Sequence, residues 1–224
     1  MYLLAFNNLF KSSCLRFLMI ETDLKLLEEV FKGERKEICC IYGLPATGKT
    51  TLAKEAAIYQ SKKDKKVVFI DSEDSFNVER ILQMAEDKKV LDNIFVLKPK
   101  NLKEQGKHLK NLLKLKNLGL VVVDTIGMYY RLELKKDVRE TNNEIDKQFN
   151  VLSELCLNGV SILITNQVYA NIDTNTVNLV GGGMFENWSK CLLKLDKDPR
   201  RLILIKPENK EVLFEIGNKG LFKQ

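Results

Sequence analysis

Short apolar runs recur along the chain, each bounded by charged or turn-forming residues. Runs of this kind are typical of strands that are buried in a sheet. They predict strands at 36–42, 67–71, 94–97, 118–124, 160–165, 191–195, 202–206 and 212–216. Because the last two connections are short and contain turn residues, we expect the chain to finish in antiparallel hairpins.

Between these runs, apolar residues repeat with the spacing of one helical face. This pattern predicts helices at 22–32, 50–60, 77–87 and 101–116, and one that ends near Asn158. In the third of them we expect an inner stripe of Val78, Ile81, Leu82 and Ala85. Residues 131–143 and 169–183 lack a clear apolar period, so both are predicted as loops, the second one mobile.

Strands that alternate with helices and end in hairpins predict an α/β fold. We expect a mostly parallel sheet flanked by helices, with an antiparallel C-terminal edge. Residues 19–224 are interpreted as a single domain. Residues 1–18 are apolar but interrupted by polar residues, so they suit neither a signal peptide nor a membrane span. They are interpreted as an extension ahead of Met19 or as a short partner-binding arm.

The composition limits the class of protein and the kinds of site that the chain can form. Hydrophobic residues make up 45% and charged residues 29% of the chain, which is ordinary for a soluble globular protein. The net charge of +6 is compatible with nucleic-acid binding without demonstrating it. The five cysteines form no CxxC pair, which favours free thiols and a cytoplasmic location away from membranes. Since His108 is the only histidine, a metal site built from histidines is excluded.

The strongest chemical signal is GLPATGKT, which follows the first predicted strand and opens a helix. This is the P-loop pattern, in which backbone N–H groups and a helix N-terminus face a phosphate chain. Lys49 is expected to reach the β- and γ-phosphates, and the Thr50 hydroxyl to bind Mg²⁺. The predicted nucleotide-binding residues are Gly43, Leu44, Pro45, Ala46, Thr47, Gly48, Lys49, Thr50 and Thr51.

Acidic and amide residues at the ends of other predicted strands add to this site. Asp124 ends the run VVVD, where a carboxylate can lie beside Mg²⁺, although it could instead cap the next turn. Glu73 could accept a proton from the attacking water, but Asp71, Asp74 and Glu79 are rivals on proximity alone. Gln167 could sense a γ-phosphate or merely cap a loop.

Lysines recur at steps of four and three along the predicted helix 101–116, so they share one face. They are Lys103, Lys107, Lys110 and Lys114. The pattern favours a solvent-exposed outer face, with a nucleic-acid patch as the alternative.

Five segments occur in the order GLPATGKT, VFIDSEDSFNVERI, LVVVDTIG, ILITNQV and VGGGMFENWSK. In this order they resemble the ATPase core of the RecA/RadA recombinases, and the resemblance runs from about Glu21 to the C-terminus. A stand-alone core of this length resembles the archaeal RadB family. The resemblance implies a RecA-like P-loop fold that binds ATP and Mg²⁺, the metal through Thr50 and Asp124. It also implies that Glu73, Lys49 and Gln167 are catalytic, and that Arg80 stacks on the adenine.

The same resemblance implies a role in DNA repair and homologous recombination, with weak ATP hydrolysis and no strand exchange by the protein alone. The implied partners are single-stranded or branched DNA, a RadA-type recombinase and a Holliday-junction resolvase. The family's two DNA-binding loops fall on 131–143 and 169–183. The basic residues expected to contact DNA are Arg131, Lys135, Lys136, Arg139, Arg200, Arg201 and Lys206.

Two departures from the family pattern matter. The second loop has no lysine or arginine, and the N-terminal region has no Phe-x-x-Ala element for polymerisation. Strong DNA binding through that loop and filament formation are therefore not expected.

The alternative functions are a KaiC-like regulatory ATPase without a DNA role and, less favoured, a small-molecule kinase. The kinase would need a mobile arginine-rich lid, which 181–183 does not supply.

Overall fold

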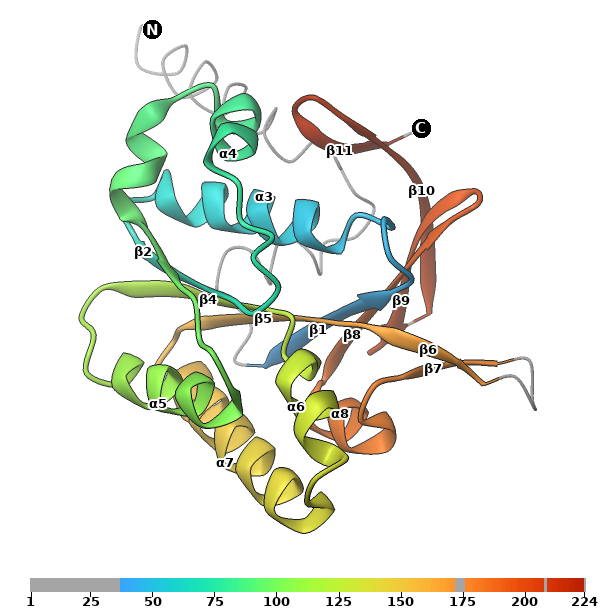
Figure 1. The fold of residues 1–224 in the computed structure, drawn as a ribbon. Helices are drawn as coiled ribbons and strands as arrows, with labels where there is room; N and C mark the ends of the chain where they lie inside the picture. Colours follow the sequence, from blue (N-terminus) through green and yellow to red (C-terminus); the bar gives the residue numbers. More distant parts are fainter. Residues whose placement is uncertain (1–36, 172–175, 208, 224) are drawn as a thin grey trace, which may run out of the picture.

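The computed structural model describes residues 37–171, 176–207 and 209–223, so the helix predicted at 22–32 and the segment 1–18 lie outside the described residues. A nine-stranded sheet forms the centre, with strand order β11-β10-β9-β8-β1-β5-β4-β2-β3 (Figure 1). Its strands are β1 (Ile38–Gly43), β2 (Lys66–Asp71), β3 (Ile94–Leu97), β4 (Leu118–Asp124), β5 (Ser161–Asn166), β8 (Cys191–Lys197), β9 (Arg200–Lys206), β10 (Lys210–Gly217) and β11 (Gly220–Lys223).

The predicted mixture of strand directions is confirmed. Every pair from β8 through β1, β5, β4 and β2 to β3 is parallel. The pairs β8–β9, β9–β10 and β10–β11 are antiparallel and form the C-terminal edge. Of the nine strands of this sheet, eight were predicted and β11 was not.

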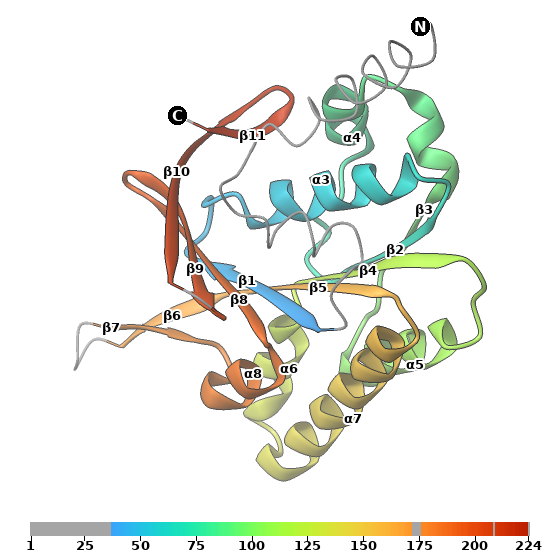
Figure 2. The same ribbon diagram turned by 180° about the vertical axis from the view of Figure 1, so that it is seen from behind.

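Helices cover both faces of the sheet, as Figure 1 and the reverse view in Figure 2 show. One face carries α3 (Lys49–Ser61), α4 (Val78–Ala85) and the short 3₁₀ helix η1 (Lys88–Asn93). The other face carries α5 (Leu102–Leu112), α6 (Gly127–Leu134), α7 (Val138–Leu157) and α8 (Gly182–Trp188). This is a three-layer α/β arrangement in which a buried parallel sheet lies between helices.

The core has two halves because successive side chains of a strand point to opposite faces. On β1, Cys39 and Ile41 pack in the half that contains Leu52 of α3. Cys40 packs in the other half, together with Phe149 of α7. The four cysteines in the described part of the chain are buried free thiols, as predicted. The strand that enters the P-loop is thus fixed from both sides.

The prediction of a loop at 131–143 is wrong, because α6 ends and α7 begins within this range, with only a short turn between them. Asp137 caps α7 by accepting a hydrogen bond from the backbone N–H of Glu140 at 2.9 Å. The two helices are joined by the Tyr130 hydroxyl, which donates to Asn142 Oδ1 at 2.9 Å. These helix ends are polar and are stabilised by a cap and by a contact between helices. Because neither leaves an apolar period in the sequence, the pattern did not reveal the helices.

Part of the second predicted loop, 169–183, also forms regular elements. It contains the two-stranded antiparallel ribbon β6 (Val168–Asn171) and β7 (Thr176–Leu179), followed by the start of α8. Figure 1 shows this ribbon projecting beyond the main sheet. A further correction concerns α4, whose buried side chains include Met84, whereas Val78 is 45% exposed.

Candidate nucleotide-binding site

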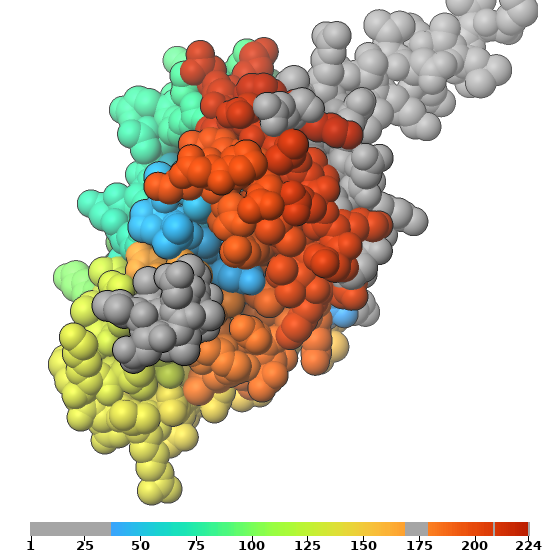
Figure 3. All heavy atoms as spheres, turned by 90° about the vertical axis from the view of Figure 1, so that its right-hand side faces the viewer, coloured from blue at the N-terminus to red at the C-terminus, as the bar shows by residue number. Residues whose placement is uncertain are grey.

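Four neighbouring parallel strands end at one edge of the sheet and bring the predicted site residues together. The order is β1, β5, β4, β2, with Tyr42 opposite Asn166 and Asp71 opposite Asp124 in the register. The P-loop follows β1, while Gln167 follows β5 and Glu73 lies just beyond β2. Carboxyl ends of parallel strands are where α/β folds place their ligands. In Figure 3, blue surface from the part of the chain that holds the P-loop is visible beside the orange and red C-terminal strands.

The P-loop itself is compact and depends on two glycines. A Cβ at Gly43 would lie 2.3 Å from the carbonyl oxygen of Leu195. Gly48 has a φ of +109°, and a Cβ there would lie 2.9 Å from Ile216. Lys49 Nζ donates to the carbonyl oxygens of Gly43 and Leu44, at 2.9 and 2.8 Å. The lysine therefore lies across the mouth of the loop, where a phosphate chain would compete with these carbonyl groups.

Asp124 is 2% exposed and accepts hydrogen bonds from three hydroxyl groups. Thr50 Oγ1 lies 2.8 Å and Ser75 Oγ 3.0 Å from Oδ2, while Thr165 donates to Oδ1. The Thr50–Asp124 contact brings together the two oxygen ligands that a P-loop site offers to Mg²⁺. Among the described residues there is no cluster of three or more metal-ligating side chains.

Glu73 is held by two side chains from other strand ends. Thr125 Oγ1 donates to Glu73 Oε1 at 2.9 Å, and Gln167 Nε2 donates to the same oxygen. The carboxylate therefore links the residue after β4 to the residue after β5.

The three rival carboxylates have other roles. Asp71 accepts two backbone N–H groups of the following turn, each at 2.9 Å. Asp74 is exposed and forms an ion pair with Lys98, and Glu79 is exposed in the first turn of α4. Asp71 also accepts from Ser75 Oγ at 3.3 Å, whereas Glu73 is the carboxylate bonded to Gln167 and Thr125.

Two lysines of α3, Lys49 and Lys54, lie near the carboxylates of the site. Burial lowers the pKa of the Lys49 ammonium group, and the negative charges of Asp124 and Glu73 oppose part of that effect. Burial likewise lowers the pKa of Lys54, which is 5% exposed and donates to the Ser75 carbonyl oxygen at 3.0 Å. Lys54 and Asp124 thus lie in a poorly hydrated part of the site, where interactions between charges are stronger than in water, while Glu73 is exposed.

Arg80 of α4 lies against the turn between β10 and β11. Its guanidinium group donates to the carbonyl oxygens of Gly217 at 2.7 Å and Asn218 at 3.2 Å. Because Ile216 of the same hairpin lies against Gly48, the turn connects Arg80 to the P-loop.

The basic residues predicted to contact DNA fall into two groups, neither of which lies within the carboxylate cluster. The first group is exposed around the turn between α6 and α7 and contains Arg131, Lys135, Lys136 and Arg139. The second is on β9. There Arg201 forms ion pairs with two carboxylates at 3.6 and 3.5 Å, and Lys206 donates to a carbonyl oxygen of α8. Arg200 donates to the carbonyl oxygen of Ala46 at 3.2 Å, so it lies beside the P-loop.

Sequence reasoning missed the supporting residues of the site, which are Lys54, Ser75, Thr125 and Thr165. Each hydroxyl lies next to or near a predicted strand end. Serine and threonine are too common at such positions to be singled out without knowing which strands are neighbours.

Comparison with known proteins agrees with this geometry. A sequence profile of the family described as Rad51 matches residues 14–222. The DNA repair and recombination protein RadB of Methanococcus maripaludis strain C5 is 37% identical over 210 residues, covering 88% of this chain and 96% of that protein. RadB of Methanocaldococcus jannaschii is 33% identical, covering 88% of this chain and 98% of its own length.

A solved structure shows the same likeness in three dimensions. The crystal structure of the RadB recombinase superposes with a TM-score of 0.73 at 29% identity, covering 85% of this chain and 91% of the other. None of the helices within the described ranges is both long and apolar enough to cross a membrane. From the sequence match, the shared fold and the arrangement of the P-loop, we conclude that the chain belongs to the Rad51 family and is similar to RadB proteins along most of its length.

Proposed function

We propose that this protein is a DNA repair and recombination accessory protein that binds ATP with Mg²⁺, hydrolyses ATP slowly and binds DNA. The observation that carries the proposal is the convergence of Lys49, Thr50, Asp124, Glu73 and Gln167 at adjacent strand ends. The similarity to RadB proteins supports the biological setting.

In this proposal the P-loop amides and Lys49 hold the phosphate chain. Thr50 and Asp124 supply oxygen ligands for Mg²⁺, which neutralises charge on the β- and γ-phosphate oxygens when bound. The hydroxyl donors around Asp124 keep this buried carboxylate in position, because an unpaired buried charge would be costly.

Glu73 is proposed to orient the attacking water and to accept its proton. Thr125 holds this carboxylate in place from the end of β4. Gln167 is proposed to respond to the γ-phosphate. Since its amide now bonds to Glu73, a competing phosphate oxygen would release Glu73 and shift β6 at the same time.

Arg80 is proposed to offer the flat face of its guanidinium group to the adenine ring. Two carbonyl oxygens of the β10–β11 turn already hold its edge, which leaves the faces of the group for stacking.

For DNA, the exposed group of Arg131, Lys135, Lys136 and Arg139 is the better-placed contact with phosphates. The β9 cations Arg201 and Lys206 would first have to leave their partners within the protein. Single-stranded or branched DNA, a RadA-type recombinase and a Holliday-junction resolvase are the proposed partners. These proposals follow from the resemblance to RadB proteins.

DNA binding tests this proposal against a KaiC-like regulatory ATPase. Single-stranded, duplex and branched DNA are titrated with and without ATP between about 50 and 200 mM salt. We expect affinity to fall with rising salt, and Lys135→Glu/Lys136→Glu to weaken it. A matched control is Lys88→Glu/Lys89→Glu in η1, which makes the same charge change on the other face of the sheet. No DNA binding at the lowest salt would refute the DNA role.

A further inference from the structure

A row of lysines runs along the outer side of α5. Lys103, Lys107 and Lys110 lie on the helix and Lys114 in the turn that follows it, and all four are exposed. The opposite side of the helix is buried through Leu102, Leu109 and Leu112. At a rise of 1.5 Å per residue the row is about 16 Å long. One strand of duplex DNA advances about 3.4 Å per nucleotide, so the row is long enough to follow several phosphates.

Part of this row borders a groove between α5 and α7 with a volume of about 460 Å³. Within this groove α5 and α7 approach closely at Gly106, where a Cβ would lie 2.6 Å from Glu144 Oε1. We call this groove, with the lysines that line it, the lysine groove. Its lining residues are Gly106, Lys107, Lys110, Glu144, Lys147, Gln148, Asn150 and Val151.

The charges in the lysine groove do not cancel. Three lysines face one carboxylate, Glu144, which is already 3.8 Å from Lys147 Nζ and accepts a long hydrogen bond from Gln148 at 3.5 Å. Within the described ranges, neither Lys107 nor Lys110 has an ion-pair partner. Ammonium groups without an ion-pair partner in the described ranges thus line the α5 side of an open groove, where they are complementary to a chain of phosphates.

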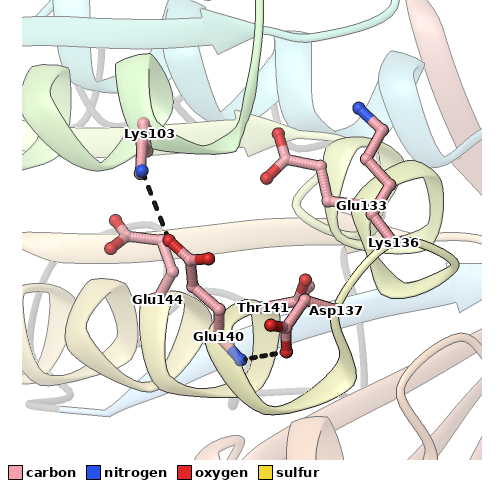
Figure 4. A pocket seen from close by; sticks show the side chains of 7 residues that line it. All are labelled: Lys103, Glu133, Lys136, Asp137, Glu140, Thr141 and Glu144. Carbon is pink, nitrogen blue, oxygen red and sulfur yellow. Dashed lines mark hydrogen bonds and ion pairs between the residues drawn. The ribbon is translucent and has the colours of Figure 1, made fainter.

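The neighbouring pocket is lined mostly by acidic side chains and extends from Glu144 of the lysine groove to Lys136 and Asp137 of the α6–α7 turn. Figure 4 shows Lys103 above Glu140 and Glu144, and Glu133 beside Lys136. Glu133 accepts from the backbone N–H of Leu102 at 3.1 Å, and Glu140 pairs with Lys103 at 3.3 Å. These carboxylates cap and join helices. The lysine groove is therefore a surface distinct from the Lys135–Lys136 region.

We propose that the lysine groove binds the phosphodiester backbone of one DNA strand, as a second DNA-contact surface of this protein. This inference rests on the proposed DNA-binding function and extends it to the α5–α7 face. Lysine ammonium groups on flexible stems neutralise phosphates without reading bases, so the contact is independent of sequence. Release of counterions from the DNA provides the driving force.

The test compares two charge-reversal variants. Lys107→Glu/Lys110→Glu changes the lysine groove, and Lys88→Glu/Lys89→Glu makes the same charge change on the other face of the sheet. Binding of fluorescent single-stranded and duplex oligonucleotides is measured by anisotropy between about 50 and 200 mM salt. We expect the groove variant to bind at least about tenfold more weakly at the lowest salt. The slope of log affinity against log salt concentration should be smaller in magnitude by roughly two, because each lost phosphate contact removes about 0.9 from that slope.

Nucleotide binding and thermal unfolding of both variants should match the unmodified protein, because the P-loop lies away from this helix pair. Equal weakening by both variants would trace the effect to net charge and overturn the groove proposal. Unchanged affinity in the groove variant, with weakened binding in Lys135→Glu/Lys136→Glu, would overturn it and leave the proposed function standing. No binding by the unmodified protein would overturn both.

Discussion

Gln167 donates a hydrogen bond from its side-chain amide to Oε1 of Glu73, which connects the ends of β5 and β2. The residue proposed to sense the γ-phosphate therefore holds the residue proposed to activate water. A nucleotide that takes the amide away from Glu73 changes both groups in one step. Because Gln167 leads directly into β6, the same event would reach the ribbon that projects from the sheet.

Replacing Gln167 by alanine should reduce the preference for ATP over ADP. With ATP bound, the amide is proposed to donate to the γ-phosphate, which ADP lacks, so its removal should weaken ATP binding and leave ADP binding unchanged. The ratio of the two dissociation constants, measured by calorimetry, is expected to move towards one. An unchanged ratio would show that Gln167 serves only to hold Glu73.

Replacing Glu73 by glutamine should lower the single-turnover rate of ATP hydrolysis by at least about 100-fold, the usual contribution of a positioned base. ATP affinity should stay within about threefold, because neither the P-loop nor Asp124 is altered. The matched control is Glu79→Gln, which changes an exposed carboxylate on the nearby helix α4. Full activity in Glu73→Gln would exclude this carboxylate as the base.

Replacing Asp124 by asparagine should abolish the dependence of ATP affinity on Mg²⁺. The amide keeps one oxygen acceptor for the hydroxyl groups, but it loses the charge that favours a divalent cation. Titrating ATP with Mg²⁺ and with EDTA checks this. An Asp124→Asn protein that still binds ATP more tightly with Mg²⁺ would contradict the assignment of the metal ligand.

Because of Glu55 in α3, we expect the free energy of unfolding to fall as pH rises. This partly buried carboxyl group accepts the backbone N–H of Leu221, and desolvation raises its pKa from 4.5 to about 8. Between these values the folded protein keeps a proton that the unfolded chain has lost, so the free energy of unfolding decreases as pH rises from about 5 to 8. We expect a loss of roughly 1–3 kcal/mol, discounted for residual solvent contact.

Urea unfolding at several pH values measures that loss. Glu55→Gln should remove most of the decrease, since the amide keeps the hydrogen-bond acceptor and cannot ionise. A decrease of equal size in the variant would assign the pH dependence to other groups.

The sequence was sufficient to predict eight of the nine strands of the central sheet, and the residues that it proposed for a phosphate site lie together in the structure. Buried parallel strands are continuous apolar runs, and the run of β4 ends in Asp124, the proposed Mg²⁺ ligand. The sequence was insufficient to predict features that depend on contacts between residues far apart in the chain. The hydroxyl of Thr165 has a role only because β5 lies beside β4, and α8 is fixed through Phe185, which packs against Phe149 with ring centroids 5.1 Å apart. Neither contact leaves a local pattern along the chain.

The central claim is that a triphosphate and its Mg²⁺ bind where the P-loop, Asp124, Glu73 and Gln167 meet. Calorimetric titration of ATP in the presence of Mg²⁺ tests it most directly, with Lys49→Ala compared against Lys63→Ala, an exposed lysine near the far end of α3. The account predicts that Lys49→Ala weakens ATP binding by at least about 100-fold, given the loss of a charge-assisted contact with the phosphates, and that Lys63→Ala binds ATP as the unmodified protein does. ATP binding that is the same in both variants would contradict the account.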